Sequence, residues 1–365
     1  MPIISINSPN CRRLWYTKDM FDLLSDVLET ARFQSFVFGK SELSAPWGVR
    51  FPAGPEEMPA HVGPPIEEIP EPLRGRKPPH PSGCFYAITR GNCILEIDGK
   101  SDPLTLAGGD LIVLLHAPGH VLRDGPTSAV RPLWKVHPFE RVRQHKGLMV
   151  GGGGAVTSLM GGAFFFQDRQ DSRLVSSLPP VLHLRAEDGR IAPWLEDTVR
   201  FMAYEMDEYG PGSQTVINHL AQILFIQAVR AYVRTLPDGN GNWLQAMLDP
   251  EIGPALGSIH HHPEVAWTVA SLADTVAMSR SAFAARFASL VGEPPLQYLT
   301  RRRMNRATDM LCENQMAIKE IALKIGYASE AAFSKAFKRV HGVAPGAYRR
   351  GVLRPDSASI PPQLP

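Results

Sequence analysis

An internal repeat constrains this 365-residue chain more than any other feature. The segment VASLADTVAMSRSAFAARFASLVGEPPLQY at residues 269–298 resembles IKEIALKIGYASEAAFSKAFKRVHGVAPGAY at residues 318–348. With one extra residue in the turn of the second copy, the matching identities are Ala273 and Ala322, Ser279 and Ser329, Phe283 and Phe333, Phe287 and Phe337, Gly292 and Gly342, Pro295 and Pro345, and Tyr298 and Tyr348. A chance match of this length is improbable, so we expect one structural unit used twice.

Each copy is predicted to form a helix-turn-helix. About nine helical residues are followed by a tight turn and by a second helix that opens on a serine, a preferred N-cap residue. In this motif the second helix is the one that can lie in the major groove of DNA. Because the paired phenylalanines lie four residues apart, they share one face, which should be buried. The residues predicted to face bases from the opposite sides are Arg280, Ser281, Ala284, Ala285, Glu330, Ala331, Ser334 and Lys335.

The segment between the copies, PPLQYLTRRRMNRATDMLCEN, is predicted to be a long helix with proline at its start. From Pro263 to Arg354 there are 14 Lys and Arg against 7 Asp and Glu, a net charge of +7, although the whole chain carries only +2. A compact basic region of this kind is typical of a nucleic-acid binder, whereas a helical bundle with solvated arginines is the alternative interpretation. The residues predicted to contact phosphates are Arg301, Arg302, Arg306 and Lys338.

The N-terminal part has the pattern of a β-rich domain. Strand-like runs at CFYAIT, NCILEIDG and DLIVLL are separated by turn signals, which favours a β-sandwich or barrel. Helical patterns follow over residues 193–210 and 213–235, and Gly151 to Gly154 is predicted to be a flexible hairpin. Residues 52–81 hold ten prolines and are predicted to form a surface loop.

The residues of the repeat resemble a known family. The stretch KEIALKIGYASEAAFSKAFKRVHGVAPGAYR is similar almost throughout to the signature of AraC/XylS-type transcriptional regulators, and the resemblance covers Trp267 to Arg350. Upstream, ELSAPWGVRFPAG and LAGGDLIVLLHAPGHVL resemble members whose sensing domain is a cupin-like β-barrel. The resemblance implies a homodimer that contacts promoter DNA and RNA polymerase, with the barrel sensing a small-molecule effector.

The expected fold class is therefore an α+β multidomain protein with a cupin-like β-barrel and helical segment, followed by an all-α double helix-turn-helix domain. We expect an effector-sensing and dimerisation domain at 1–236, a linker and leading helix at 237–262, the DNA-binding domain at 263–350 and a disordered tail at 351–365.

The barrel offers candidate residues for an effector pocket. His120 fits the second cupin motif, but Tyr86 stands where related regulators often have histidine, and no His-x-His-x3-4-Glu pattern occurs. A metal-dependent cupin enzyme is thus an alternative with little support, and neither catalysis nor a metal or other cofactor is expected. The candidate pocket residues are Trp47, Tyr86, His116 and His120.

A second alternative is a redox-responsive regulator that senses oxidants through Cys11, Cys84 or Cys93. Arginines beside Cys11 would favour its thiolate, and Cys84 and Cys93 flank a predicted turn, which would place them on neighbouring strands. The competing interpretation is that buried cysteines act as small hydrophobic residues.

The location of the chain is predicted to be the cytoplasm. The N-terminal residues lack the basic and apolar regions of a secretory signal. No apolar stretch is expected to reach the roughly 18 to 20 residues that a membrane span needs, so no membrane partner is predicted.

Overall fold

The computed structural model describes residues 24–25, 33–54, 57, 83–137, 147–166, 173–186, 193–236, 243–313 and 316–353. The chain divides into two compact units that part between Leu236 and Pro237. Most of the proline-rich segment 52–81, the first cysteine Cys11 and residues 354–365 of the predicted tail lie outside the described residues.

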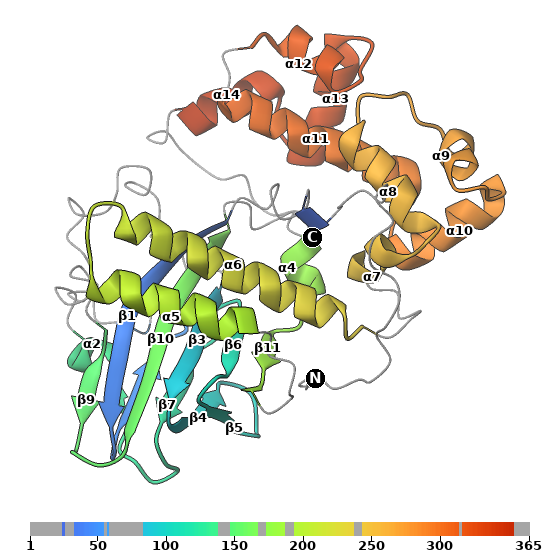
Figure 1. Ribbon diagram of the computed structural model, residues 1–365. Coiled ribbons are helices and arrows are strands. Elements are labelled where there is room, and N and C mark those ends of the chain that lie inside the picture. The colour runs from blue at the N-terminus through green and yellow to red at the C-terminus, as the bar shows by residue number, and fades with distance from the viewer. Residues whose placement is uncertain are drawn as a thin grey trace. The chain divides into compact units, whose positions relative to one another are not determined.

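The first unit is built on two β-sheets (Figure 1). The six-stranded sheet has the order β11-β6-β3-β10-β1-β9, and the five-stranded sheet has the order β5-β4-β7-β2-β8. The strands are β1 Phe33–Ser44, β2 Gly48–Phe51, β3 Gly83–Arg90, β4 Asn92–Ile97, β5 Leu104–Ala107, β6 Leu111–Leu115, β7 His120–Arg123, β8 Arg131–Pro132, β9 Met149–Gly151, β10 Val156–Phe166 and β11 Val181–Leu184. Short helices α2 (Leu133–Val136) and α4 (Arg173–Ser177) lie between strands. Three strands follow the predicted runs, and the β-rich architecture is confirmed.

Strand β3 is buried on both of its faces. Side chains alternate across a strand, so Tyr86 and Ile88 point into the core between the sheets while Phe85 points to the other face. Both sets are buried, and for this reason the strand is a continuous apolar run rather than an alternating one. The core between the sheets also takes Val49 and Leu122 from the five-stranded sheet.

Two helices, α5 (Pro193–Asp207) and α6 (Ser213–Val233), cover the outer face of the six-stranded sheet (Figure 1). Phe225 of α6 is fully buried, with its ring centroid 5.0 Å from those of Phe33 and Phe164. Burial of one such side chain contributes roughly 1.5–3 kcal/mol. Asn218 accepts a hydrogen bond from Ser35 of β1, which fixes the helix on the sheet.

Helix α6 departs from one expectation of the sequence. A stretch of 18 residues within its 21 residues reaches a mean hydropathy of 1.2, so this helix is long and apolar enough to cross a membrane, contrary to the prediction that no stretch would be. In the structure 44% of that stretch is buried, and the helix packs on β1. The apolar residues of α6 that face the sheet are therefore accounted for by the core of this unit.

The glycines at 151–154 do not form the predicted hairpin. Strand β9 runs parallel to β1 and β10 runs antiparallel to it, so the two strands lie on opposite sides of β1. The glycine segment passes over the end of β1, where the amides of Gly152 and Gly154 donate to the carbonyls of Ser44 and Ala45. A Cβ at Gly152 or Gly154 would press on the Ala45 backbone, so this close crossing requires glycine.

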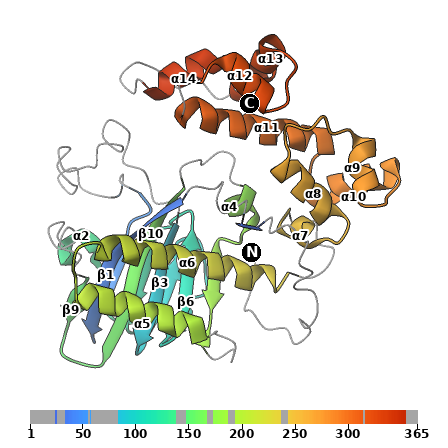
Figure 2. The ribbon, with the colours of Figure 1, turned by 45° about the horizontal axis from the view of Figure 1, so that its top comes forward.

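The second unit is entirely helical in its described residues (Figure 2). Its helices are α7 Trp243–Leu248, α8 Ile252–His261, α9 Val269–Thr275, α10 Arg280–Val291, α11 Pro295–Glu313, α12 Ile318–Lys324, α13 Glu330–His341 and α14 Pro345–Leu353. The fold is thus an N-terminal β-rich unit with helices and a C-terminal helical unit, as predicted. Residues 351–353, predicted as tail, continue α14.

The segment 237–262, predicted as a linker and leading helix, contains the helices α7 and α8. Leu244, Ile252 and Leu256 are each 0% exposed, and α7 packs on both α8 and α10. Trp243 and Met247 are also buried. The apolar residues of this segment therefore form part of the core of the helical unit.

The two helix-turn-helix units, α9–α10 and α12–α13, begin and end as the repeat predicts. The hydroxyls of Ser279 and Ser329 accept hydrogen bonds from the amides of Ala282 and Ala332 at 3.3 and 3.2 Å, so both predicted N-caps are confirmed. Both second helices end at a glycine with positive φ, Gly292 and Gly342 in the sequence.

Besides the extra residue of the second copy, the two turns differ at the position of the left-handed residue. Gly326 has a φ of +86°, whereas the equivalent residue of the first copy is Ala277, with a φ of +53°. An alanine in this left-handed region costs roughly 1–2 kcal/mol. A Cβ at Gly326 would overlap the carbonyl oxygen of Glu264, so the second turn is packed against backbone.

Candidate nucleic-acid interface and sensing core

The second helices α10 and α13 expose the residues predicted to face bases. Phe283, Phe287, Phe333 and Phe337 are all 0% exposed, so each helix turns its opposite side outward. Of the eight predicted residues, Ala284 and Ser334 are half-buried and the other six are exposed, namely Arg280, Ser281, Ala285, Glu330, Ala331 and Lys335. Small side chains dominate the outer face of α10, which allows a close approach to another surface.

The charges on the two helices are arranged differently. Helix α13 carries the exposed cations Lys335 and Lys338 beside Glu330 in its first turn. On α10, Arg286 instead binds the acidic turn between α7 and α8, at 2.8 Å from Asp249 and 3.0 Å from Glu251. Sequence analysis missed this interaction because Asp249 lies 37 residues away in the presumed linker.

Asp249 joins three parts of this structure. Its Oδ1 accepts hydrogen bonds from the amides of Glu251 and Ile252 at the start of α8, and its Oδ2 accepts a hydrogen bond from the guanidinium of Arg286. Burial alone would raise the pKa of Asp249, but the hydrogen bonds from Arg286 and the two amides hold that pKa below its usual value. The carboxylate therefore stays charged and fastens α10 to α8.

The arginines of α11 are less available than the sequence predicted. Arg301 lies 2.5 Å from Glu293 and its guanidinium is 5.0 Å from the Tyr298 ring centroid. Arg306 is 3.7 Å from Glu264, and Arg302 is half-buried. Neighbouring carboxylates thus already pair with Arg301 and Arg306, while the contacts of these three side chains with a DNA backbone stay a prediction. Lys338 is exposed.

In the first unit, three of the four pocket candidates are buried in or against the core between the sheets. The Tyr86 hydroxyl lies 2.6 Å from Nε2 of His120, and Nδ1 of His120 lies 2.7 Å from the Pro118 carbonyl oxygen. Because a carbonyl can only accept, Nδ1 carries the proton and Tyr86 donates to Nε2. Phe51 stacks on the imidazole at 4.8 Å between ring centroids.

Burial sets the charge state of this pair. Desolvation lowers the pKa of His120 to about 4, although the bond to Pro118 opposes the shift. Burial also raises the pKa of Tyr86 well above its usual value. Both groups are therefore neutral near pH 7, and they present hydrogen-bonding atoms in an apolar surrounding.

Trp47 and His116 fall in different environments. Trp47 is 2% exposed within the same core, and its indole nitrogen has no hydrogen-bond partner among the described residues. His116 is exposed on the turn after β6, with a φ of +63°. It does not join the other candidates, because the turn directs it outward.

An ion pair that sequence analysis did not identify lies beside His120. Arg50 of β2 makes two contacts of 2.5 Å with the carboxylate of Asp98, which follows β4. A Cβ at Gly119 would overlap this carboxylate, so glycine lets the pair sit directly against the start of β7. The hydrogen bonds from Arg50 lower the pKa of Asp98. No local sequence pattern links residues 48 positions apart, so only the sheet register reveals the pair.

The cysteines do not lie on paired strands. Cys84 is on β3 of the six-stranded sheet and Cys93 on β4 of the five-stranded sheet, so the prediction of neighbouring strands is wrong. The turn between them crosses from one sheet to the other. Both are buried, and desolvation raises each pKa to about 12, so both remain thiols.

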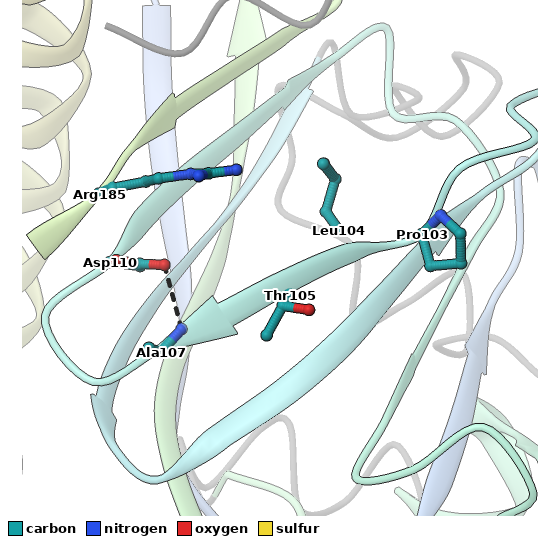
Figure 3. Close-up of a pocket in the computed structure, with 6 residues that line it drawn as sticks. All are labelled: Pro103, Leu104, Thr105, Ala107, Asp110 and Arg185. Carbon is teal, nitrogen blue, oxygen red and sulfur yellow. Dashed lines mark hydrogen bonds between the residues drawn. The ribbon is translucent and has the colours of Figure 1, made fainter. Parts of the chain in front are cut away.

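The structure shows no metal centre within its described residues, where no group of three or more His, Cys, Asp or Glu could hold an ion. A hollow of about 350 Å³ does lie at β5 (Figure 3), and neither Tyr86 nor His120 is among the residues that line it. It is lined by Pro103, Leu104, Thr105, Ala107, Asp110 and Arg185. Asp110 is already engaged there by His183 at 3.0 Å and by the amides of Ala107 and Ala186.

A β-rich unit followed by two helix-turn-helix units on one connecting helix defines a class of two-domain regulators of transcription. Two family profiles match this division, one described as Cupin over residues 22–234 and one described as a helix-turn-helix domain over residues 272–351.

Relatives of known description agree. A protein of Streptomyces lividans described as an AraC-like transcription regulator is 38% identical over 275 residues, which cover 74% of this chain and 88% of that protein. The regulator AlkR of Acinetobacter baylyi is 43% identical over 49% of this chain and 58% of its own length. The DNA-binding domain of AdpA, solved with a target DNA, is 33% identical over 30% of this chain and 99% of that domain, with a TM-score of 0.28. The chain belongs to the AraC family of transcription regulators, whose curated relatives here are regulators rather than enzymes.

Proposed function

We propose that this regulator binds promoter DNA by placing α10 and α13 in the major groove. The observation that carries the proposal is the equivalence of the two helices. Each begins at a serine cap, buries a phenylalanine pair and turns small or polar residues outward. Residues such as Ser281 and Glu330 would contact base edges, and Lys338 would contact a phosphate.

The α11 arginines would contribute phosphate contacts only by exchanging partners. Arg301 would have to leave Glu293, and Arg306 would have to leave Glu264. The side chains of Arg306 and Glu264 are 42% and 41% exposed, so that exchange costs little compared with a new phosphate contact. The side chains of Arg301 and Glu293 are only 22% and 10% exposed, so breaking that pair costs more. The net charge of +7 between Pro263 and Arg354 supports steep salt dependence of binding.

The test uses the full chain and a duplex selected by that chain from a randomised library. Replacement of Glu330 by Ala should change which sequences are preferred, with a cost of about 1–3 kcal/mol on the selected duplex if a good contact is lost. Replacement of Lys338 by Ala should weaken binding to selected and random duplexes alike and reduce the salt slope by about one unit. If the Lys338 variant alters preference while the Glu330 variant leaves it unchanged, the faces are assigned the wrong way round.

We further propose that the first unit senses a small-molecule effector in the core around Tyr86 and His120. The neutral hydrogen-bonding pair, the aromatic wall of Phe51 and the indole N–H of Trp47 suit a largely apolar ligand with a hydrogen-bond acceptor. His116, which is exposed, is left out of this proposal. Once an inducer is known, His120→Ala should abolish or shift the response while DNA binding is retained. An unchanged dose response would place the effector elsewhere.

The outer faces of α5 and α6 are proposed as the homodimer contact. Phe201 and Tyr204 of α5 are 46% and 60% exposed, and Ile223 of α6 is 43% exposed. Exposed apolar side chains on adjacent helices are typical of an interface. Sedimentation of the full chain should show a dimer, and Tyr204→Glu should shift it toward monomer. We also propose RNA polymerase as a partner, because a regulator bound at a promoter lies where the polymerase begins transcription. A cytoplasmic location is proposed for the same reason.

The redox alternative gains no support from Cys84 and Cys93, since both are buried thiols with a pKa raised to about 12. Cys11 lies outside the described residues.

A further inference from the structure

A junction at the middle of α11 joins the two helix-turn-helix units. Arg303 donates through Nε to the Pro263 carbonyl at 2.6 Å and through a terminal nitrogen to the Val265 carbonyl at 2.9 Å. Those carbonyls belong to the loop that leads directly into α9. Arg303 therefore holds the entrance of the first helix-turn-helix unit.

The same guanidinium reaches the turn of the second helix-turn-helix unit. It lies 5.6 Å from the centroid of the Tyr327 ring, in the turn between α12 and α13. The neighbouring Gly326 is so close that a Cβ would overlap the Glu264 carbonyl oxygen and press on Arg303. The loop before α9, the middle of α11 and the turn before α13 thus meet at one point, which we call the Arg303 junction (residues 263–265, 303 and 326–327).

Besides this junction, helix α11 joins the two helix-turn-helix units. Its first turns pack on α10, with Tyr298 5.8 Å from Phe287 between ring centroids. Its later turns pack in the other core, where Met304 and Leu311 surround Phe333 and its neighbours. These two sets of contacts lie at different parts of α11, so they do not fix the orientation of one helix-turn-helix unit relative to the other. The junction adds a direct tie between them.

Arg303 is committed to this internal role. Two of its nitrogens bind backbone carbonyls and its face covers Tyr327. Arg301 and Arg306 differ, since they pair with carboxylates that a phosphate could replace. The bidentate fork and flat face of Arg303 suit a site where lysine would satisfy only part of the geometry.

We propose that Arg303 is a positioning residue that sets the separation and angle of α10 and α13, and with them the spacing of the two DNA segments that the chain accepts. The inference rests on the proposed function. Two recognition helices that enter successive major grooves must match a repeat of about 34–36 Å. A fixed geometry lowers the entropy lost when both bind together and penalises duplexes whose spacing is wrong.

The test compares the spacing tolerance of two arginine variants in the full chain. Probes are the duplex selected by the wild-type chain, the same duplex with one base pair inserted between its two protected segments, and the duplex with one segment scrambled. The matched control is Arg349→Met. Arg349 also donates to a backbone carbonyl, that of Met316 at 2.6 Å, but this bond does not reach the first helix-turn-helix unit.

The wild type should bind the inserted duplex at least about tenfold more weakly than the selected one, which corresponds to about 1.4 kcal/mol. Arg303→Met should reduce that penalty to about threefold or less, and should weaken binding to the selected duplex while leaving the scrambled one unchanged. Arg349→Met should keep the wild-type penalty. Gly326→Ala, which forces the Glu264 loop away by a different route, should reproduce the phenotype of Arg303→Met and keeps the test valid if Arg303→Met does not fold.

Three outcomes are distinguishable. A wild-type chain that selects no duplex would refute the proposed function. Wild-type selection of a spaced duplex, with the insertion penalty intact in both Arg303→Met and Gly326→Ala, would refute the positioning role alone. Equal weakening of all three probes by Arg303→Met but not by Arg349→Met would instead make Arg303 a phosphate contact, and would also overturn the inference.

Discussion

Replacement of His120 by Gln tests the buried pair in the first unit through its pH dependence. The folded pKa of His120 is about 4, below its usual 6.5. Between these values the unfolded chain binds a proton that the native chain does not, so stability is present above pH 6.5 and is lost as the pH falls toward 4. The shift corresponds to about 3 kcal/mol in total, of which about 2 kcal/mol is lost by pH 5. Gln keeps one donor and one acceptor but does not titrate.

The assay unfolds the full chain in a series of urea concentrations at pH 7.5 and at pH 5.0. A short deuterium pulse at one fixed pH then labels the unfolded fraction, and peptides from β3 and β7 report the free energy of unfolding around His120. The wild type should lose about 2 kcal/mol more than His120→Gln between the two pH values. Tyr86→Phe should lower stability at both pH values by roughly 1 kcal/mol and keep most of the pH dependence, because burial is the main cause of the shift. An identical pH dependence in wild type and His120→Gln would refute the reasoning, since His120 would then not be a buried neutral group.

Two further predictions concern the core of the helical unit and the thiols. Leu244→Ala should destabilise the helical unit by about 2–4 kcal/mol, whereas Leu248→Ala on the same helix, where the leucine is 39% exposed, should cost less than about 1 kcal/mol. The readout is amide-exchange protection of α8 and α10, and equal losses in the two variants would mean that α7 is a linker after all. Cys84 should resist alkylation in the native full chain while the exposed Cys312 is modified, because burial raises the pKa of Cys84 to about 12. Mass spectrometry after a short iodoacetamide treatment measures this, and modification of both cysteines at one rate would contradict the burial of Cys84.

Local rules account for the parts of the structure that the sequence predicted well. Serine caps, glycine ends and phenylalanines four residues apart act within one or two helical turns, so the repeat alone identifies the helices α10 and α13 and their inner faces. The same holds for the β-rich N-terminal unit, where turn signals bound short apolar strands. The base-facing roles of residues such as Glu330 stay predictions, since burial shows which face is outward and not what it binds.

Several of the errors concern where segments that are separate in the sequence lie in the fold. After Arg90, the last residue of β3, the chain passes from the six-stranded sheet to the five-stranded sheet. This crossing separates Cys84 from Cys93, although the sequence shows only a turn. The glycines at 151–154 cross over the end of β1 because β9 and β10 pair with opposite sides of that strand.

Sequence by itself thus determined the family, the two-domain order and the helix-turn-helix pattern, because caps, periodicity and repeats are written in neighbouring residues. Only the tertiary structure decided which polar groups meet. Arg286 with Asp249, Arg50 with Asp98 and Arg303 with the loop before α9 are paired by packing across 37, 48 and 40 residues. Such pairs depend on the register of sheets and the crossing of helices, and a single sequence does not encode these at any fixed spacing.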